Sequence, residues 1–453
     1  MSPTIYCQDA QVFFDGHPCF GQAISFRLNG GKIYSAYGPN GAGKTTLTRF
    51  LSGVIPEVYN YSMQGSLRVG ERVCDEPAEK ARCVSVIPER SESLLLGLNV
   101  DEELALAVAK IPESASAMPV CDISDRLQLG PLKRQPISTL STGEKKRLQI
   151  AVAIMSERPF VVCDDSFRGL DAHWKEQTMR LLVECAQAQE RTILSITSDE
   201  SESRNHVTTD LSIFRCHETQ SRRVSAEQYV PVIRELASVP PACEAPSALA
   251  IPSLIERGTF RIRSEVRRLE VGSIYIVKGS NGSGKTTLLL AFAGLIPRRT
   301  WAGLISRRTM RPDCAIAMYD PTYQLFDSTL EGVFSQRQGF ARDKLIRLVC
   351  QDFDCRSSTD PLSLSFGQRK FLVLLQMFAS GRSIILLDDP LSGLDEHHRG
   401  IVSELLTMFS TLPSRLVVAT SPEGWLDEQS KRADVRTLQL TKGNDSASSL
   451  EEF

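Results

Sequence analysis

The feature that most constrains the fold of this 453-residue chain is a glycine-rich segment that occurs twice. Each copy follows a short apolar run rich in β-forming residues, at 32–37 and 273–278, and precedes a leucine-rich helical pattern. The first copy consists of Gly38, Pro39, Asn40, Gly41, Ala42, Gly43, Lys44, Thr45 and Thr46. The second consists of Gly279, Ser280, Asn281, Gly282, Ser283, Gly284, Lys285, Thr286 and Thr287. A repeated strand–loop–helix unit predicts an α/β protein made of two similar halves.

Both copies fit the pattern G-x-x-x-x-G-K-T, which is typical of a loop that binds phosphate. The glycines let backbone N–H groups approach phosphate oxygens, and the N-terminus of the following helix adds a partial positive charge. Lys44 and Lys285 are expected to reach the outer phosphates of a nucleotide. The hydroxyls of Thr45 and Thr286 are expected to bind Mg²⁺. We therefore expect ATP and Mg²⁺ as the cofactors of both halves.

Two further segments repeat downstream of the loops, in the same order in each half. One is Leu-Ser-x-Gly, which begins at residue 140 and again at residue 364. The other is an apolar strand that ends in two aspartates, Asp164 and Asp165 in the first half and Asp388 and Asp389 in the second, with Gly-Leu-Asp close behind. A strand that ends in aspartate places a carboxylate beside the phosphate loop, so we expect Asp164 and Asp388 to hold Mg²⁺.

The length of the chain agrees with two or three globular domains, and its composition gives no sign of a polyanionic partner. The 52 lysine and arginine residues nearly balance 54 acidic residues, for a formal charge of −2, so nucleic acid is not an expected partner. The twelve cysteines show no C-x-x-C spacing and are expected to be reduced thiols. The sequence shows neither a secretory signal nor an apolar stretch of about 18 residues, so we expect no membrane anchor within the chain.

The repeats also predict where the domains begin and end. We expect a first nucleotide-binding domain at 1–235, a linker rich in Pro and Ala at 236–252, a second nucleotide-binding domain at 253–440 and a polar C-terminal tail at 441–453. The separation between the phosphate loop and Leu-Ser-x-Gly differs between the halves. The region between these two motifs is therefore expected to be the variable part of each domain.

The Leu-Ser-x-Gly segments resemble the signature motif of the ATP-binding cassette (ABC) ATPases, and all the repeated motifs occur in the order of that superfamily. The resemblance implies that each half has a mixed-sheet core, an antiparallel β portion at its start and an inserted helical subdomain. It also implies a pseudo-dimer within one chain, in which the signature of one half covers the nucleotide held by the other half. The residues paired in this way are Ser365 and Gly367 with Lys44, and Ser141 and Gly143 with Lys285.

Three positions that the superfamily uses for catalysis differ in both halves. The glutamate that usually follows the strand aspartate is replaced by Asp165 and Asp389, and the switch histidine is replaced by Ser198 and Ser421. The glutamine that contacts Mg²⁺ and the attacking water falls on Glu89 in the first half and on Tyr319 in the second. Aspartate is one methylene shorter than glutamate, and serine cannot carry the charge of histidine. We therefore expect ATP binding with reduced hydrolysis, with these positions as the catalytic candidates.

The segment at 319–326 looks like the sequence Q-D-P-x-x-Q-L-F of cobalt-type and energy-coupling-factor importer ATPases, with Tyr319 in place of the leading glutamine. This resemblance implies the motor subunit of a transporter, bound at the cytoplasmic face of a membrane to separate integral membrane subunits. A soluble ABC protein that acts without a transporter, and an ATP-dependent scaffold with weak hydrolysis, are the alternatives. Ribosome-acting tandem ABC proteins usually carry a long charged linker, whereas the linker expected here is short and almost uncharged.

Overall fold

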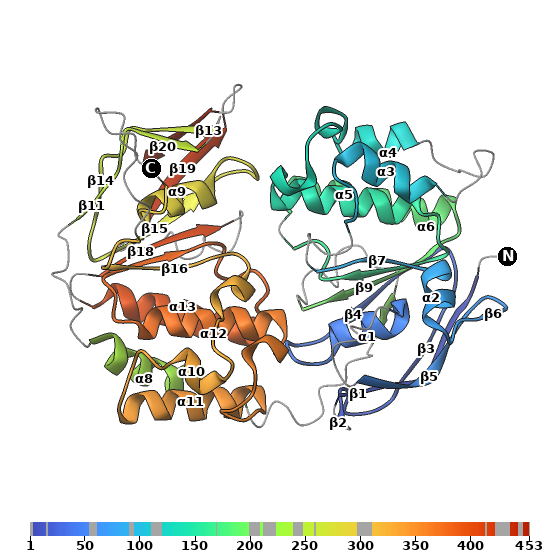
Figure 1. Ribbon diagram of the computed structural model, residues 1–453, viewed down its shortest axis with the longest axis horizontal. Helices are drawn as coiled ribbons and strands as arrows, with labels where there is room; N and C mark the ends of the chain where they lie inside the picture. Colours follow the sequence, from blue (N-terminus) through green and yellow to red (C-terminus); the bar gives the residue numbers. More distant parts are fainter. Residues whose placement is uncertain are drawn as a thin grey trace. The chain divides into compact units, whose positions relative to one another are not determined.

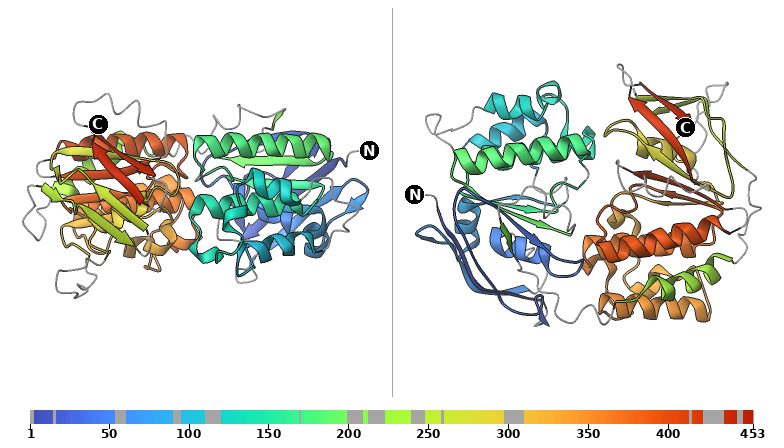
Figure 2. Two further views of the ribbon diagram at one scale, coloured as in Figure 1. Left: turned by 90° about the horizontal axis from the view of Figure 1, so that it is seen from above. Right: turned by 180° about the vertical axis from the view of Figure 1, so that it is seen from behind.

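The computed structural model describes residues 3–14, 17–53, 61–89, 95–109, 120–168, 170–198, 209–211, 223–238, 248–257, 260–296, 310–412, 415–421, 435–442 and 447–452. The chain divides into two compact units, 1–217 and 218–453. Each unit contains parallel strands with helices on both faces of the sheet (Figures 1 and 2). Within the described ranges, no helix has the length and apolar character needed to cross a membrane.

The core of the first unit is a five-stranded parallel sheet in the order β10-β4-β9-β8-β7. Its strands are β4 (Ile33–Tyr37), β7 (Val84–Ile87), β8 (Phe160–Asp164), β9 (Thr192–Thr197) and β10 (Thr209–Leu211). Every residue of β8 is buried, as expected for an apolar run in a sheet that is covered on both faces. Because β4 and β8 both flank β9, the loop after β4 and the aspartate that ends β8 lie at the same edge of the sheet.

An antiparallel sheet packs beside this core and is built from β1 (Ile5–Phe14), β2 (His17–Pro18), β3 (Ile24–Leu28), β5 (Tyr61–Val69) and β6 (Arg72–Val73). The helices are α1 (Lys44–Ser52), α2 (Pro77–Cys83), α3 (Val100–Val108), α4 (Val120–Arg126), α5 (Thr142–Met155) and α6 (Ala172–Ala188), with 3-10 turns at Gly130–Leu132 and Ile137–Thr139. Phe160 and Val162 face α1 and the antiparallel sheet, whereas Val161 and Cys163 face α3 to α6. Helices α3 and α4 therefore form the helical insertion expected between the phosphate loop and the signature.

The second unit contains an eight-stranded sheet in the order β12-β13-β20-β19-β15-β18-β17-β16. Its strands are β12 (Leu254–Arg257), β13 (Phe260–Ser264), β15 (Ser273–Lys278), β16 (Cys314–Ala317), β17 (Ile384–Leu387), β18 (Leu416–Ser421), β19 (Val435–Lys442) and β20 (Ala447–Glu452), and a separate pair joins β11 (Ala248–Ala250) to β14 (Arg268–Glu270). Strand β15 lies between β19 and β18, so the loop after β15 is two strands from the end of β17. The arrangement repeats that of β4, β9 and β8.

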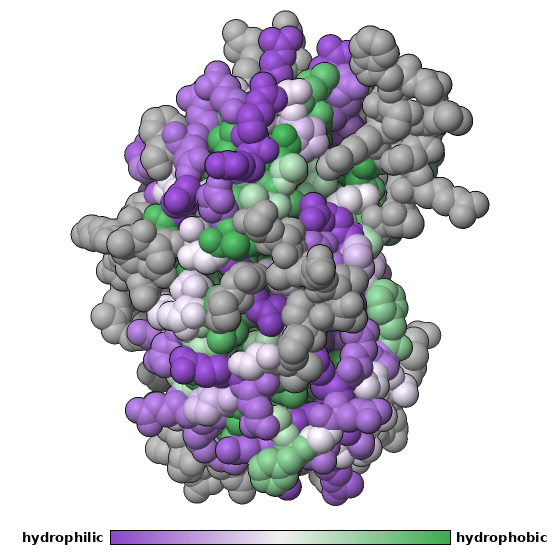
Figure 3. All heavy atoms as spheres, turned by 90° about the vertical axis from the view of Figure 1, so that its left-hand side faces the viewer, coloured by the Kyte–Doolittle hydropathy of each residue, from purple (hydrophilic) through white to green (hydrophobic). Residues whose placement is uncertain are grey.

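The helices of the second unit are α8 (Ala226–Ser238), α9 (Lys285–Phe292), α10 (Leu330–Val333), α11 (Phe340–Phe353), α12 (Phe366–Ala379) and α13 (Glu396–Ser410), with 3-10 turns at Pro321–Gln324 and Pro361–Ser363. Helix α9 covers one face of the sheet, and α12 and α13 cover the other. Apolar side chains are concentrated in the two clusters that these helices form with the sheet. On the face of the molecule drawn in Figure 3, hydrophobic side chains are instead scattered among hydrophilic ones.

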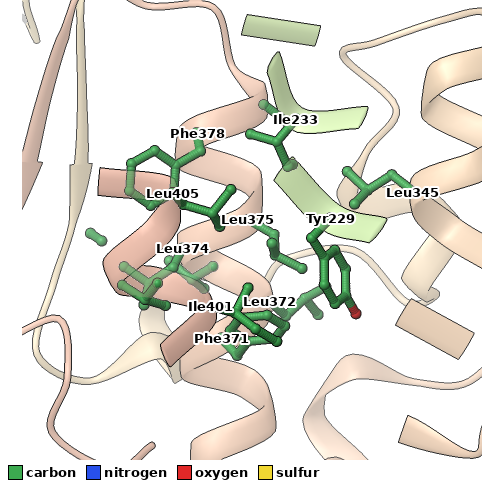
Figure 4. Close-up of a cluster of buried hydrophobic side chains, with 14 of the residues drawn as sticks. Tyr229, Ile233, Leu345, Phe371, Leu372, Leu374, Leu375, Phe378, Ile401 and Leu405 are labelled. Carbon is green, nitrogen blue, oxygen red and sulfur yellow. The ribbon is translucent and has the colours of Figure 1, made fainter. Parts of the chain in front are cut away.

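Helix α8 packs in the second unit, although it precedes the sheet of that unit in sequence. Its Tyr229 and Ile233 lie in a cluster with Phe371 of α12 and Ile401 of α13, and both side chains are fully buried (Figure 4). The hydroxyl of Tyr229 donates a hydrogen bond to Asp352 Oδ2 of α11 at 3.0 Å. Burial of two such side chains contributes about 3 to 6 kcal/mol, which holds α8 against α11, α12 and α13.

The unit boundary and the C-terminal segment differ from the sequence-based expectations. The boundary expected after residue 235 falls inside α8, because the packing of that helix places the division between His217 and Glu218. Residues 239–247 of the expected linker lie outside the described residues. The expectation of a polar tail at 441–453 is wrong, since β20 pairs with both β13 and β19. The segment is polar in composition, but it forms strand β20, in which Leu450 is fully buried.

Candidate nucleotide-binding sites

The first phosphate loop joins β4 to α1, and its shape depends on two glycines. Gly41 and Gly43 have φ angles of 83° and 86°, in the left-handed region that favours glycine. A Cβ atom at Gly43 would lie 2.6 Å from a ring carbon of Phe20, so a larger residue would not fit there. Gly43 is also the N-cap residue of α1 and supplies no side-chain cap. The first turn of α1 thus has the uncapped backbone N–H groups that a phosphate group binds.

The side chain of Lys44 folds back over this loop. Its Nζ donates a hydrogen bond to the carbonyl oxygen of Pro39 at 2.8 Å, and the side chain is buried. Burial lowers the pKa of Lys44, and the negative charge of Asp165 opposes that effect in part. A buried ammonium group is stabilised by an anion, because burial removes the water that would otherwise solvate its charge. A phosphate group at the loop would supply that anion.

The second phosphate loop, between β15 and α9, has the same construction. Gly282 and Gly284 have φ angles of 77° and 101°. A Cβ atom at Gly284 would lie 2.4 Å from the ring of Phe260, as one at Gly43 would approach Phe20 in the first unit. Lys285 Nζ donates to the carbonyl oxygens of Gly279 at 2.6 Å and Ser280 at 3.1 Å. The two aromatic rings that support the loops were not expected from the sequence, because Phe20 precedes β3 and Phe260 lies in β13, each more than 20 residues before its glycine.

The strand aspartates lie next to the loop threonines in both units, as predicted. Thr286 Oγ1 donates to Asp388 Oδ2 at 2.8 Å, and Thr420 Oγ1 donates to Asp388 Oδ1 at 2.8 Å. In the first unit, burial raises the pKa of Asp164 to about 7, together with the charges of Glu89 and Asp165, while a hydrogen bond from Thr45 lowers it. Asp164 Oδ1 is buried and has no hydrogen-bond partner within the described part of the chain.

These two pairs fit Mg²⁺. The ion takes oxygen ligands, and a carboxylate beside a threonine hydroxyl provides two of them. A cation at Asp164 would give its unpartnered oxygen a ligand and would counter the burial and the neighbouring charges that raise the pKa of this carboxyl group. The described residues contain no group of three His, Cys, Asp or Glu side chains able to hold a metal without a nucleotide. In a complex with ATP, phosphate oxygens would supply further ligands.

The aspartates after the strands, Asp165 and Asp389, share an unusual backbone conformation. Their φ angles are 43° and 48°, values that non-glycine residues seldom adopt. Asp165 N donates to Ile196 O at 2.8 Å, and Asp389 N donates to Thr420 Oγ1 at 2.9 Å. The strand after each aspartate-bearing strand thus fixes the turn. Backbone strain of this kind is concentrated at functional sites, which agrees with the roles expected for these two residues.

In the first unit, the three unusual catalytic positions are joined by a side chain that the sequence did not single out. Arg168 binds the carboxylate of Glu89, donates to Ser198 Oγ at 2.7 Å, and pairs with Asp165 Oδ2 at 3.2 Å. Ser198 also donates to Asp165 Oδ1, from N at 2.9 Å and from Oγ at 3.2 Å. Burial raises the pKa of Asp165, but Arg168, Lys44 and Ser198 outweigh it and lower this pKa below its usual value.

The second unit does not repeat this network. Ser392 stands three residues after Asp389, where the first unit has Arg168 three residues after Asp165. Tyr319 takes the place of Glu89, and its ring lies 6.4 Å from the ring of Phe366. The backbone of Ser421 ends β18, but its side chain lies outside the described residues. Comparison of the halves position by position would have found Arg168, because the second half has a small neutral residue there.

A buried lysine, five residues after each signature serine, ties the signature helix to the loop that carries Glu89 or Tyr319. Lys146 Nζ of α5 donates to Pro88 O at 2.6 Å and Glu89 O at 3.0 Å. Lys370 Nζ of α12 donates to Met318 O at 2.8 Å, Tyr319 O at 3.1 Å and Asp388 O at 3.0 Å. Burial lowers the pKa of Lys146 to about 8. These lysines were also missed, because their carbonyl partners are distant in sequence.

The signature serines begin helices. Ser141 Oγ accepts from Glu144 N at 3.3 Å, and the Glu144 carboxylate accepts from Ser141 N at 2.8 Å. Ser365 and Gln368 form the same capping box at the start of α12. Gly143 and Gly367 follow in the first turns of these helices. Each signature therefore presents a helix N-terminus, which suits a phosphate group. The pairing of each signature with the phosphate loop of the other half stays a prediction.

Comparisons with known proteins agree with this geometry. Residues 22–168 and 267–392, together more than half of the chain, match the family model described as ABC transporter. A putative ABC transporter ATP-binding protein of Streptococcus pneumoniae is 24% identical over 452 residues, which cover 85% of this chain and 80% of that protein. The putative HMP/thiamine import ATP-binding protein YkoD of Bacillus subtilis is 24% identical over 442 residues, covering 84% and 80%. The solved structure titled RNase-L Inhibitor shares the fold, with a TM-score of 0.56 at 17% identity, over 98% of this chain and 90% of that chain.

Proposed function

We propose a function from one established premise: this chain belongs to the ABC transporter family. It is the ATP-binding and ATP-hydrolysing motor of a transporter of the energy-coupling-factor type. It works at the cytoplasmic face of a membrane with separate integral membrane subunits. Its two halves close on two ATP molecules, each held by the phosphate loop of one half and covered by the signature of the other.

The nucleotide chemistry is supported by what the loops already hold. Lys44 and Lys285 donate to loop carbonyls, so each ammonium group can move to a phosphate without losing a hydrogen bond. The pairs Thr45–Asp164 and Thr286–Asp388 would hold Mg²⁺, which offsets phosphate charge during phosphoryl transfer. Asp165 and Asp389 would then orient the attacking water.

The observation that carries the transporter function is a matched pair of exposed apolar side chains. Leu96 lies seven residues after Glu89, and Phe326 lies seven residues after Tyr319. Their exposed fractions are 84% and 87%, the largest among the exposed apolar side chains of the described residues. An apolar residue exposed to this degree at the same place in both halves indicates a protein contact, since a single scattered case would need no explanation.

The backbone beneath these side chains is held in place. Leu96 N and Gly97 N donate to Glu103 Oε2 at 2.7 Å and 2.5 Å, and Glu103 is buried. In the second unit, the side chain of Gln324 accepts from Met318 N and donates to Ile316 O, both at 2.6 Å. Loops fixed in this way lose little conformational entropy when a partner covers them. Segments of the membrane subunits that face the cytoplasm are the proposed partners.

The importer type is supported by two independent features. The segment at 319–326 resembles that of energy-coupling-factor ATPases, and its Gln324 and Phe326 have the structural roles just described. The relative YkoD is named for HMP/thiamine import. We propose a small organic nutrient of that kind as the cargo, imported through the membrane subunits.

The test is affinity purification from detergent-solubilised membranes of the native host, with identification of co-purifying proteins. Wild type is expected to retain integral membrane proteins. The double variant Leu96→Asp with Phe326→Asp is expected to lose them, because each change removes about 1.5 to 3 kcal/mol of apolar burial. Val73→Asp with Leu254→Asp is the matched control, because these exposed apolar residues lie on strands β6 and β12.

Equal retention by both double variants would contradict the proposed contact. If wild type retains no integral membrane protein but co-purifies with ribosomes or soluble proteins, the chain is an ABC protein that acts without a transporter. The formal charge of −2 favours membrane subunits over ribosomes as partners, because nothing in the overall charge attracts the chain to RNA.

A further inference from the structure

Arg168 is a buried positive charge at a position where the second unit has the neutral residue Ser392. Its side chain is 9% exposed and lies between the carboxylates of Glu89 and Asp165, whose side chains are 14% and 7% exposed. The second unit has neutral residues at both matching positions, Tyr319 for Glu89 and Ser392 for Arg168. The first unit therefore differs from the second by a complete buried ion pair rather than by one charge.

The presence of the pair is explained by the charges around it. Asp164, Asp165 and Glu89 bring three carboxylates to the place where the phosphates of ATP would bind. The cation of Lys44 is nearby and is already needed for phosphate. An unpaired buried Glu89 would repel the nucleotide and would itself be costly to desolvate. Arg168 removes that repulsion, so the first site can keep its affinity for ATP.

The same contacts restrict Asp165. Its Oδ2 pairs with Arg168 at 3.2 Å, and its Oδ1 accepts from Ser198 N at 2.9 Å and Ser198 Oγ at 3.2 Å. Both carboxylate oxygens are therefore engaged by the protein. A carboxylate that orients or deprotonates water must direct a free lone pair toward it. Asp165 is also one methylene shorter than the usual glutamate, so it has little freedom to reach around these partners.

We propose that Arg168 is a positioning residue that restrains Asp165 and Glu89, so that the first site retains ATP and hydrolyses it more slowly than the second. This inference rests on the proposed ATP-binding function and goes beyond it, since it assigns different roles to the two sites. Arg168 acts through its partners, because its guanidinium group is occupied by Glu89, Asp165 and Ser198. The second site lacks this restraint at residue 392.

The experiment uses the full chain with Lys285→Ala, so that the first loop is the tight site. The protein is mixed with MgATP, free nucleotide is removed rapidly, and the conversion of retained ATP to ADP is followed with time. The charge-balanced variant Glu89→Ala with Arg168→Ser, which does not introduce the glutamine of the superfamily, is expected to convert ATP about tenfold faster, since a misplaced catalytic group can forfeit on the order of 100-fold in rate. Arg168→Lys, which keeps the charge but not the forked geometry, is expected to fall between the two.

Arg168→Ser alone leaves Glu89 buried and unpaired, and this variant is expected to lose ATP or fail to fold. The double variant avoids that difficulty. Its matched control is Glu176→Ala with Arg180→Ser, an exposed ion pair on α6 of the same unit, which is expected to leave the rate unchanged.

If Arg168 has only a structural role, the double variant should have a lower melting temperature and a lower rate of ATP conversion. If Arg168 restrains Asp165, the double variant should convert ATP faster. An unchanged or slower conversion in the double variant, with ATP still retained, would overturn this inference and leave ATP binding intact. Failure of the Lys285→Ala protein to retain any ATP, when the Lys44→Ala protein also retains none, would overturn the proposed ATP-binding function itself.

Discussion

The two phosphate loops are built alike, but the residues that surround the expected terminal phosphate are not. Gly43 and Gly284 have the same left-handed backbone, and each approaches a phenylalanine ring. Beyond the loops, the first unit has a buried ion pair and the second has neutral residues. The comparison predicts that the two sites bind ATP alike and differ in the rate of turnover. The halves share the loop glycines and lysines, whereas Glu89 and Arg168 of the first unit have no charged counterpart in the second.

The largest expected effect tests the similarity of the loops. Lys44→Ala and Lys285→Ala each remove a charge-assisted phosphate contact worth roughly 1.5 to 3 kcal/mol, so each should weaken MgATP binding at its own site by about 10- to 100-fold. Equilibrium binding of a fluorescent ATP analogue measures both variants and their combination. Lys32→Ala and Lys344→Ala serve as controls, because both lysines are exposed. A double variant that binds MgATP like wild type would place the sites elsewhere.

The next effect concerns pH and involves a buried histidine of the second unit. Burial by itself lowers the pKa of His398, but hydrogen bonds and charges from Asp352 and Asp395 raise it to about 9. The ring nitrogens lie 2.8 Å from Asp395 Oδ1 and 3.2 Å from Asp352 Oδ2. The unfolded value is 6.5, so this stabilisation is fully present below about pH 6.5 and is lost as pH rises to about 9.

The free energy of unfolding of the second unit should fall by about 3 kcal/mol over this range. The figure is the difference between the folded and unfolded pKa values of His398, at 1.36 kcal/mol for each pKa unit. Urea denaturation followed by hydrogen-exchange mass spectrometry reports each unit separately and measures it at pH 6 and pH 9.5. The first unit has Trp174 at the matching position, stacked on Arg147 at 4.1 Å, and is expected to change less. Equal loss of stability in both units, or no loss in the second, would show that His398 is not the group responsible.

A smaller effect separates the two sites in turnover. Asp389→Glu with Ser421→His should raise steady-state phosphate release about tenfold, because a longer carboxylate reaches the water and histidine contacts the terminal phosphate. Asp165→Glu with Ser198→His should raise it less, since Arg168 still pairs with the carboxylate. Steady-state phosphate release measures both. If the wild type releases phosphate rapidly and either double variant slows that release, aspartate and serine already form an efficient catalytic site.

The smallest effect tests the signature helices. Ser141→Ala and Ser365→Ala each remove an N-cap and should reduce the stability of their own unit by about 1 kcal/mol. Because both serines form the same capping box, the two losses should be equal. Thermal unfolding without nucleotide measures this, and Ser403→Ala in the middle of α13 is the control. A markedly unequal loss would show that one signature is stabilised by contacts beyond its cap.

Local spacing explains what could be predicted from the sequence. The phosphate loops, the strand aspartates and the signatures each depend on residues within about ten positions, so their patterns survive in a single sequence. The network around Arg168 could not be found in this way, because two of its members, Glu89 and Ser198, are 79 and 30 residues distant from the arginine. Lys146 and Lys370 were missed for the same reason, with carbonyl partners 58 and 52 residues away.

Two parts of the fold also lay beyond local reasoning. The sequence of β20 is polar, and it becomes a strand because β13 and β19 accept it between them. Helix α8 carries a clear amphipathic pattern, but nothing in that pattern says which unit will cover its apolar face. Tertiary packing decides both cases, in keeping with the weakness of local propensity against burial.

The position of α8 has a consequence for synthesis on the ribosome. Its apolar face is buried by α11, α12 and α13, which extend as far as Ser410, about 170 residues after α8 ends. At typical elongation rates of about 5 to 20 residues per second, α8 emerges roughly 10 to 30 seconds before its covering helices are complete. During that interval the first unit can finish folding while Tyr229 and Ile233 stay uncovered. The nascent chain therefore passes through a stage that a holding chaperone would be expected to recognise.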